Sequence, residues 1–325
     1  MDELPIKPCA KYITHYLKRN FVFSPGSQDI HKNPVIFFSD NYDDGITPTV
    51  LDSILDYFFH LNPCRHLIVI DRRGSGWIPT KKLLIHLNLN YLDHIEYVVL
   101  LRPQGFFQRL GSDRTVASIY NDISFDLQLI DSPSDLFNII PACEILSQIG
   151  GELFFDVSLW VDFQIEIESF QRCACDLGLE IQSFVVDISK VEALARLPQD
   201  FTTFELVRDR VESLQRRRRQ LQRRLSSCES RGVDLRKRLR ELRESSSSEE
   251  EVVEAKKRIA NEEISSLDLP KDRSSQILVV EQYIIQLSET RSKLRKFWNR
   301  YARGLRNLQK LEDFESHFKK VCIFT

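Results

Sequence analysis

The sequence predicts an α/β domain with a mostly parallel sheet, followed by an all-α region in which three long helices pack as a coiled-coil bundle. Two observations support this prediction. In the first half of the chain, short apolar runs alternate with segments of helical periodicity, at the spacing of strand–helix–strand units. In the second half, apolar residues recur at alternating steps of three and four, which is the heptad pattern of helices that pack against one another.

Four strands are expected in the first half. Residues 35–38, 67–70 and 98–101 are apolar throughout, which is typical of strands covered on both faces. Their starts are 32 and 31 residues apart, which is the length of a βαβ unit. Within 123–130, apolar and polar residues alternate, so this strand is expected to be half exposed.

The segments between the first three strands are expected to be helices. Residues 49–61 place their apolar side chains on one stripe, and residues 79–89 begin with a proline at a favoured first-turn position. Helices that alternate with strands predict a mostly parallel sheet with helices packed against it. We assign residues 1–157 to this first domain.

Residues 158–325 are expected to form the helical region. Heptad series begin at Phe163, Phe204 and Ile277, and they indicate a left-handed bundle. Arg218 and Gly232 stand in the second series where apolar residues are expected. Because a second repeat would need two more helices, we expect that repeat to be truncated.

Composition excludes several classes of protein. The chain has 325 residues, a net charge of −2 and 42% hydrophobic residues, which is typical of globular domains and gives no global case for nucleic-acid binding. Neither a CxxC pair, an HExxH motif nor zinc-type spacing occurs, so we expect no metal and no cofactor. The apolar runs fall far short of the ~20 residues of a membrane span. We expect a cytoplasmic protein that is peripheral at membranes.

Arginines follow two neighbouring predicted strands. Arg72 and Arg73 come directly after residues 67–71, and Arg102 follows 98–101. Ligands of open α/β sheets bind outside the carboxyl ends of the strands, and guanidinium groups suit anionic head groups. These three residues are therefore lipid-binding candidates. The alternative is a surface ion pair, such as Asp71 with a neighbouring arginine, which contributes little.

No motif predicts catalysis. The segment 74–76, Gly-Ser-Gly, lacks the third glycine of a dinucleotide fingerprint and the GK[ST] of a P-loop, so a simple turn is expected. A GxSxG elbow is absent, and nothing in the sequence arranges a catalytic triad. We therefore expect no enzyme activity and assign no catalytic residues.

The densest charge cluster lies in the second predicted helix, at Arg216, Arg217, Arg219 and Arg223. These side chains spread over more than one helix face. Either the helix is simply solvated, or the arginines contact an acidic membrane or an acidic protein. Since no aromatic residues accompany the cluster, nucleic acid is not an expected partner.

Several segments carry a family resemblance. They are residues 33–38, 69–73 with Trp77, 101–109 (LRPQGFFQR), 146–153 (LSQIGGEL), and 297–298 with 308–318. The first four resemble the Sec14-like (CRAL-TRIO) domain of Dbl- and Dbs-type Rho guanine-nucleotide exchange factors, and the last resembles the spectrin-type helices that follow it there. The LRPxGFFQR segment is specific to those proteins.

The resemblance implies a Sec14-like domain followed by spectrin-repeat helices. It also implies phosphoinositide-linked membrane targeting and restraint of an exchange domain. The expected partners are a phosphoinositide or anionic membrane surface and Rho-family exchange machinery. The catalytic Dbl-homology domain would lie beyond Thr325, so exchange activity is not expected of this chain.

The alternative function is a structural adaptor whose spectrin-type helices bind a protein partner. The sustained heptad pattern favours it. Self-association through the helices also stays open, because Trp298, Phe314 and Phe318 would lack a partner if the last repeat were truncated.

Overall fold

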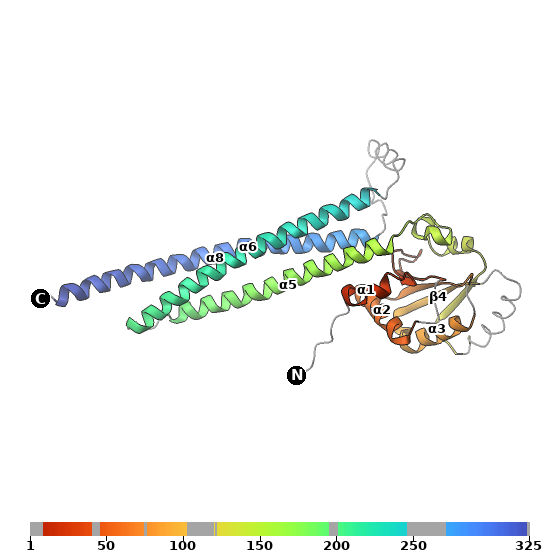
Figure 1. The fold of residues 1–325 in the computed structure, drawn as a ribbon, viewed down its shortest axis with the longest axis horizontal. Helices are drawn as coiled ribbons and strands as arrows, with labels where there is room; N and C mark the ends of the chain where they lie inside the picture. The colour runs from red at the N-terminus through yellow and green to blue at the C-terminus, as the bar shows by residue number, and fades with distance from the viewer. Residues whose placement is uncertain are drawn as a thin grey trace. The chain divides into compact units, whose positions relative to one another are not determined.

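A computed structural model describes residues 9–40, 46–74, 77–102, 120, 122–194, 201–245 and 271–323 (Figure 1). The chain divides into two compact units. The first comprises residues 1–168 and 242–276, and the second comprises 169–241 and 277–325. The sheet belongs to the first unit, and the second consists of helices.

The first unit contains a five-stranded sheet whose strands follow the order of the chain. The strands are β1 (Val22–Phe23), β2 (Val35–Phe38), β3 (His66–Asp71), β4 (Ile95–Leu101) and β5 (Asp126–Ile130). Neighbouring strands from β2 to β5 are parallel, and β1 pairs antiparallel with β2. The predicted mostly parallel sheet is therefore confirmed, and every residue of β2 and β3 is buried.

The last strand begins later than expected. Residues 123–125 precede β5 because the Asn88 side chain holds their backbone. Its carbonyl oxygen accepts from the backbone N–H of Ser124 at 2.7 Å, and its amide donates to the Asp122 carbonyl at 3.3 Å. The pairing with β4 therefore starts at Asp126.

Three helices accompany the sheet, namely α1 (Ala10–Leu17), α2 (Pro48–Leu61) and α3 (Trp77–Asn90). Helices α2 and α3 were predicted, whereas α1 and β1 were not. The N-terminus of α1 is held from a distance, because Glu168 accepts bonds from the Ala10 backbone N–H at 3.0 Å and the Tyr57 hydroxyl at 2.8 Å. Glu168 lies in α5 (Val157–Leu194), whose first turns join the same apolar core.

A compact segment lies between β5 and α5. It contains the short 3₁₀ helices η2 (Pro133–Asn138), η3 (Ala142–Glu144) and η4 (Ser147–Ile149). Gly150 has a φ of 100°, and a Cβ at Gly151 would lie 2.1 Å from the Ile145 carbonyl oxygen. The tight turn within the 146–153 motif therefore requires both glycines.

The second unit is built from α5, α6 (Phe201–Ser245) and α8 (Lys271–Ile323), three long helices that lie side by side (Figure 1). The predicted helical bundle is confirmed. Helix α6 runs antiparallel to both neighbours. Its Arg217 and Arg224 pair with Asp187 and Glu180 of α5, and its Glu229 and Arg240 pair with Arg291 and Glu281 of α8, so the numbering rises in α6 as it falls in each neighbour.

The two off-pattern residues of α6 each have a packing role. A Cβ on Gly232 would lie 2.6 Å from the Phe170 ring, so α5 approaches too closely for a side chain there. The Arg218 guanidinium lies over the Trp298 ring, with its carbon 4.8 Å from the ring centre.

The expectation that Trp298 lacks a partner is wrong. Its ring is buried, lies 6.1 Å from that of Phe184 on α5 and also packs against Tyr301. The side chains of Phe314 and Phe318 lie outside the described part of the chain.

Candidate functional site

The three arginines predicted to bind lipid lie at one edge of the sheet. Arg72 follows β3, and its backbone N–H donates to the Leu101 carbonyl at 3.1 Å. Arg102 follows β4, and its backbone N–H donates to the Ile130 carbonyl at 3.0 Å. Since the parallel strands end together, the structure does bring these arginines to a common carboxyl edge.

Arg73 is held by a carboxylate of the preceding strand. Its Nε lies 3.0 Å from Asp71 Oδ1 and its Nη2 lies 2.8 Å from Asp71 Oδ2, which is a bidentate ion pair. Nη2 also donates to the Gln148 carbonyl at 3.2 Å. The hydrogen bonds to Asp71 raise the pKa of the Arg73 guanidinium. About a quarter of the side chain (28%) stays exposed, so Arg73 is open to solvent on one side.

The other two arginines differ in their access to solvent. Arg102 Nη2 lies 2.6 Å from Asp131 Oδ1, and its side chain is 19% exposed. Arg72 is fully buried. The cations at this edge are thus accompanied by carboxylates, and an anionic head group would compete with Asp71 and Asp131 for Arg73 and Arg102.

The turn after β3 is also engaged by a carboxylate. The backbone N–H of Gly74 donates to Asp40 Oδ2 at 2.5 Å, and a Cβ on Gly74 would lie 2.6 Å from that oxygen. The amide that a phosphate loop would use is therefore bonded to the protein itself. Ser75 and Gly76, like residues 103–119 with most of the LRPQGFFQR motif, lie outside the described residues.

A cavity of about 630 Å³ lies at the opposite edge of the sheet. Its walls come from residues 30, 31 and 33, from the starts of β4 and β5, and from 138–139. They include Glu96 and Asp126 but no lysine or arginine. Behind them, the buried Asp29 accepts hydrogen bonds from the Tyr97 hydroxyl at 2.8 Å and from two backbone N–H groups. The cavity is therefore a poor match for an anionic head group.

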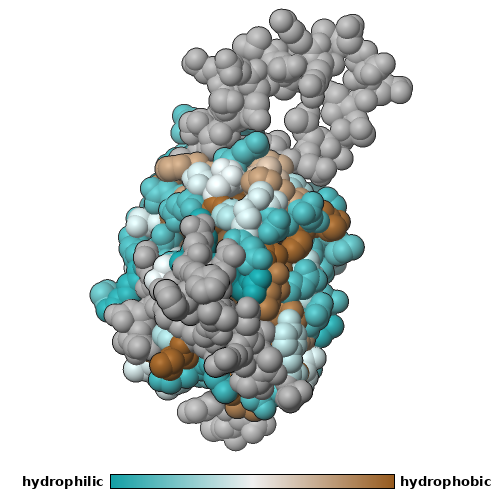
Figure 2. All heavy atoms as spheres, turned by 90° about the vertical axis from the view of Figure 1, so that its right-hand side faces the viewer, coloured by the Kyte–Doolittle hydropathy of each residue, from teal (hydrophilic) through white to brown (hydrophobic). Residues whose placement is uncertain are grey.

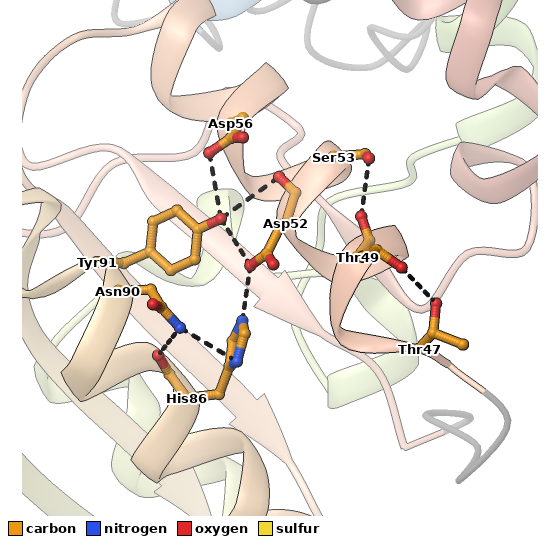
Figure 3. Close-up of polar contacts among 8 residues, drawn as sticks. All are labelled: Thr47, Thr49, Asp52, Ser53, Asp56, His86, Asn90 and Tyr91. Atoms are coloured by element: carbon orange, nitrogen blue, oxygen red, sulfur yellow. Dashed lines mark hydrogen bonds and ion pairs between the residues drawn. The ribbon is translucent and has the colours of Figure 1, made fainter.

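A polar cluster joins α2 to α3 (Figure 3). His86 Nε2 lies 2.7 Å from Asp52 Oδ1, and the Tyr91 hydroxyl lies 2.9 Å from the same oxygen and 3.1 Å from Asp56 Oδ1. The amide of Asn90 faces the other ring nitrogen of His86 at 3.2 Å. Burial and the bond to Asp52 raise the pKa of Tyr91.

That cluster joins the two helices through side chains of both. Both ring nitrogens of His86 have hydrogen-bond partners within it. The nearby hydroxyl of Ser53 donates to the Thr49 carbonyl (Figure 3). No cluster of three or more potential metal ligands occurs within the residues that the structure describes.

The four arginines expected at a partner contact separate into internal and exposed groups. Arg217 bonds Asp187 on α5, which lowers the pKa of that carboxyl, and its guanidinium carbon lies 5.8 Å from the centre of the Phe184 ring. Arg216 pairs with Glu212 one turn away, at 3.3 Å. Arg219 and Arg223 are exposed. Arg217 therefore serves the bundle itself.

Sequence reasoning overlooked the cations of α8. Residues 291–303 contain six lysines and arginines and no acidic residue. This run of basic residues is visible in the sequence, but the heptad pattern of the same segment concerns only its apolar positions.

Where its residues are described, the face drawn in Figure 2 is largely hydrophilic, with a hydrophobic strip and smaller hydrophobic patches. This described part of the face gives no broad apolar area for insertion into lipid. None of the helices in the described ranges combines the length and hydropathy needed to cross a bilayer.

The fold and the strand-end site define a class: an α/β sheet domain joined to a three-helix bundle, with charged side chains at the carboxyl edge of the sheet. No family model matches the chain. The human guanine nucleotide exchange factor DBS is 25% identical over 331 residues, which cover 98% of this chain and 26% of DBS.

Two further relatives match shorter regions. The human probable guanine nucleotide exchange factor MCF2L2 is 25% identical over 78% of the chain and 21% of its own length. The zebrafish (Danio rerio) SEC14 domain and spectrin repeat-containing protein 1 is 21% identical over 50% of the chain and 23% of its own length.

The chain is thus similar, over nearly its whole length, to exchange factors of the Dbl family, and in part to a protein named for Sec14 and spectrin-repeat domains. This confirms the resemblance drawn from the sequence motifs. The chain spans about a quarter of the length of the curated relatives that it matches.

Proposed function

We propose that this chain is a non-catalytic, lipid-binding and regulatory module related to Rho guanine-nucleotide exchange factors. It serves phosphoinositide-linked membrane targeting and autoinhibition, in the cytoplasm and at the membrane periphery. The similarity to DBS over 98% of the chain is the observation that carries this proposal. Residues 1–157 act as the Sec14-like domain and 158–325 as the spectrin-type helices, and the exchange reaction belongs to a different domain.

In this proposal the strand-end arginines receive a phosphorylated head group. Arg73 and Arg102 are the accessible members, and they are paired with Asp71 and Asp131, respectively. A phosphomonoester carries about −1.5 to −2 charges at pH 7, more than a carboxylate, so it can displace Asp71 and Asp131 from them. Arg72, which is fully buried, adds positive charge without touching the ligand.

Vesicle flotation against a phosphoinositide panel tests the lipid site. We expect the variant Arg73→Gln/Arg102→Gln to lose phosphoinositide-dependent flotation. The control Arg65→Gln/Lys82→Gln removes two exposed cations from the same unit and should float like the unaltered chain. Equal flotation of both variants would remove the head-group site from the proposal.

Nucleotide exchange assays test autoinhibition. Adding the chain in excess to a Dbl-homology and pleckstrin-homology fragment of DBS should slow nucleotide release from its GTPase. Unchanged rates, together with no binding between the two proteins, would contradict the regulatory role.

The second candidate is a structural adaptor whose helices bind a protein partner. Two exposed apolar pairs favour it, each with members one heptad apart: Leu179 with Val186 on α5, and Leu278 with Ile285 on α8. A pull-down in which residues 158–325 suffice, combined with no flotation of the full chain, would favour the adaptor over the lipid-binding module.

A further inference from the structure

Two stretches of the second unit carry only basic charge. Residues 216–224 of α6 contain six arginines and no acidic residue, and residues 291–303 of α8 contain six basic residues and no acidic one. The two stretches lie side by side, because Arg218 of the first lies over Trp298 of the second. Segments far apart in the sequence therefore concentrate positive charge in one section of the bundle.

One exposed cation of each stretch lies on the flanks where α6 and α8 meet. The ion pair between Arg240 and Glu281 joins these flanks. On α6, Arg219 stands three heptads before Arg240 and therefore lies on the same side of the helix as Arg240. On α8, Arg295 stands two heptads after Glu281 and lies on the same side as Glu281. Arg219 and Arg295 therefore border the same interhelical groove, and both are exposed.

Further along the bundle, the same groove is electrically balanced. Glu229 pairs with Arg291, and Glu281 accepts Arg240 as well as the more distant Arg236 at 3.9 Å. Towards α5, Arg217 and Arg224 are likewise matched by carboxylates.

Five of the exposed cations that remain in the two stretches form what we call the basic face. It consists of Arg219, Arg223, Arg295, Lys296 and Arg303. Within the described part of the chain, no ion pair neutralises these five side chains. They therefore present uncompensated charge to solvent.

The surroundings of the basic face indicate the kind of partner. Of the described side chains on α6 and α8, the exposed large hydrophobic ones are Val233, Leu278 and Ile285, and all three lie outside the two basic stretches. Protein partners are usually anchored by buried aromatic or apolar residues, which this face lacks. An anionic bilayer needs only a high density of lysine and arginine.

We infer that the basic face docks onto an anionic lipid bilayer. This contact goes beyond the head-group site of the proposed function, because it requires negative surface charge but no phosphoinositide. Each lysine or arginine near such a surface strengthens binding about fivefold, and salt screens the attraction within about 10 Å at 0.1 M ionic strength. Binding should therefore weaken steeply with added salt.

Sedimentation of the full chain with phosphatidylcholine vesicles, with and without phosphatidylserine and free of phosphoinositide, tests this inference. The variant Arg219→Gln/Arg223→Gln/Lys296→Gln should bind phosphatidylserine vesicles about a hundredfold more weakly than the unaltered chain. The control Lys190→Gln/Arg210→Gln/Lys237→Gln removes three exposed cations that lie outside the two basic stretches of the same unit and should bind normally. Circular dichroism should show equal helix content in all three.

Two results would overturn the inference. The first is equal binding by the variant and the control, and the second is failure of the unaltered chain to bind phosphatidylserine vesicles. If the chain instead binds an acidic peptide or a nucleic-acid duplex, and the variant loses that binding, the basic face serves that partner and not the bilayer. Phosphoinositide flotation that depends on Arg73 and Arg102 would stand in either case, so the two proposals fail separately.

Discussion

Arg218 occupies a heptad position that faces the bundle core, where an apolar residue is the usual choice. Its Nε is buried and has no hydrogen-bond partner among the described residues, and burial lowers the pKa of its guanidinium. The compensating contact is the Trp298 ring. Cation–π contacts of this kind are worth about 0.5–2 kcal/mol, which only partly offsets a desolvated cation.

We therefore expect opposite effects from two substitutions of Arg218. Arg218→Leu restores the apolar pattern and should raise the free energy of unfolding by about 1 kcal/mol. Arg218→Ala loses both the ring contact and the packed stem, and should lower that free energy by about 1–2 kcal/mol. Urea unfolding followed by tryptophan fluorescence measures both. If Arg218→Leu lowered the free energy of unfolding, the contact between the guanidinium and the Trp298 ring would stabilise the fold by more than the desolvation of the guanidinium destabilises it.

His66 lies buried at the start of β3, with its ring against Phe59. Burial lowers its pKa to about 4, helped by the charge of His94 and opposed by hydrogen bonds to the backbone of residues 64 and 94. In the unfolded chain histidine titrates near pH 6.5. The unfolded state therefore binds the proton first as the pH falls, and stability declines between about pH 6.5 and pH 4.

The expected loss from His66 is about 2 kcal/mol between pH 7 and pH 5. Urea unfolding of the unaltered chain and of His66→Gln at both pH values measures it. The variant should be less sensitive to pH by that amount. An identical pH dependence in the two proteins would show that His66 is already charged, or already exposed, in the folded state.

At the scale of elements, Gly232 shows why a helix interior tolerates a poor helix former. Alanine is better than glycine there by about 1 kcal/mol. However, its Cβ would lie 2.6 Å from the Phe170 ring and 2.9 Å from Ile284 Cγ1. Moving α5 and α8 away from a packed core costs about 1–3 kcal/mol.

Gly232→Ala should therefore lower the free energy of unfolding by about 1–2 kcal/mol. Gly178→Ala on α5 is the matched control, because nothing lies within 4 Å of the added Cβ. That variant should be stabilised by up to about 1 kcal/mol. If both variants gained stability in urea denaturation, the close approach of α5 to Gly232 would be contradicted.

Periodicity predicted the elements whose cause is local, and missed those whose cause lies elsewhere in the chain. The sequence showed the apolar runs of β2, β3 and β4, because a strand buried on both faces is apolar at every residue. It showed the heptads of α5, α6 and α8, because a helix buried along one stripe has apolar residues at regular spacing. Helix α1 does place Ala10, Ile13 and Leu17 on one buried stripe, but its 8 residues are too few for a distinctive pattern, and its first N–H group is held by Glu168, more than 150 positions away. The late start of β5 likewise depends on Asn88, which belongs to another element.

The candidate sites follow the same rule. Strand ends placed Arg72, Arg73 and Arg102 at one edge, because parallel strands end together. Their burial and their carboxylate partners depend on side-chain packing, which the motif does not contain. In the helices, the sequence showed the arginine cluster of α6. Which of its arginines contact the bundle and which are exposed depends on the register of α6 against α5 and α8, which the sequence alone does not give.

For the molecule as a whole, the two compact units predict two unfolding transitions. Each contains a buried tryptophan, Trp160 in the first unit and Trp298 in the second. In a Trp77→Phe background, removal of either one leaves a reporter for the other unit. Because each unit has its own apolar core, a change confined to one should act mainly on that unit.

Gly232→Ala should therefore shift the urea midpoint reported by Trp298 and leave the midpoint reported by Trp160 in place. Helices α5, α6 and α8 each contribute residues to both units, so coupling would pass along these helices. Equal shifts of both midpoints would show that the helices transmit the loss and that the chain unfolds as one cooperative body. Separate shifts would mean that the sheet domain keeps its strand-end site folded after the bundle has lost its packing.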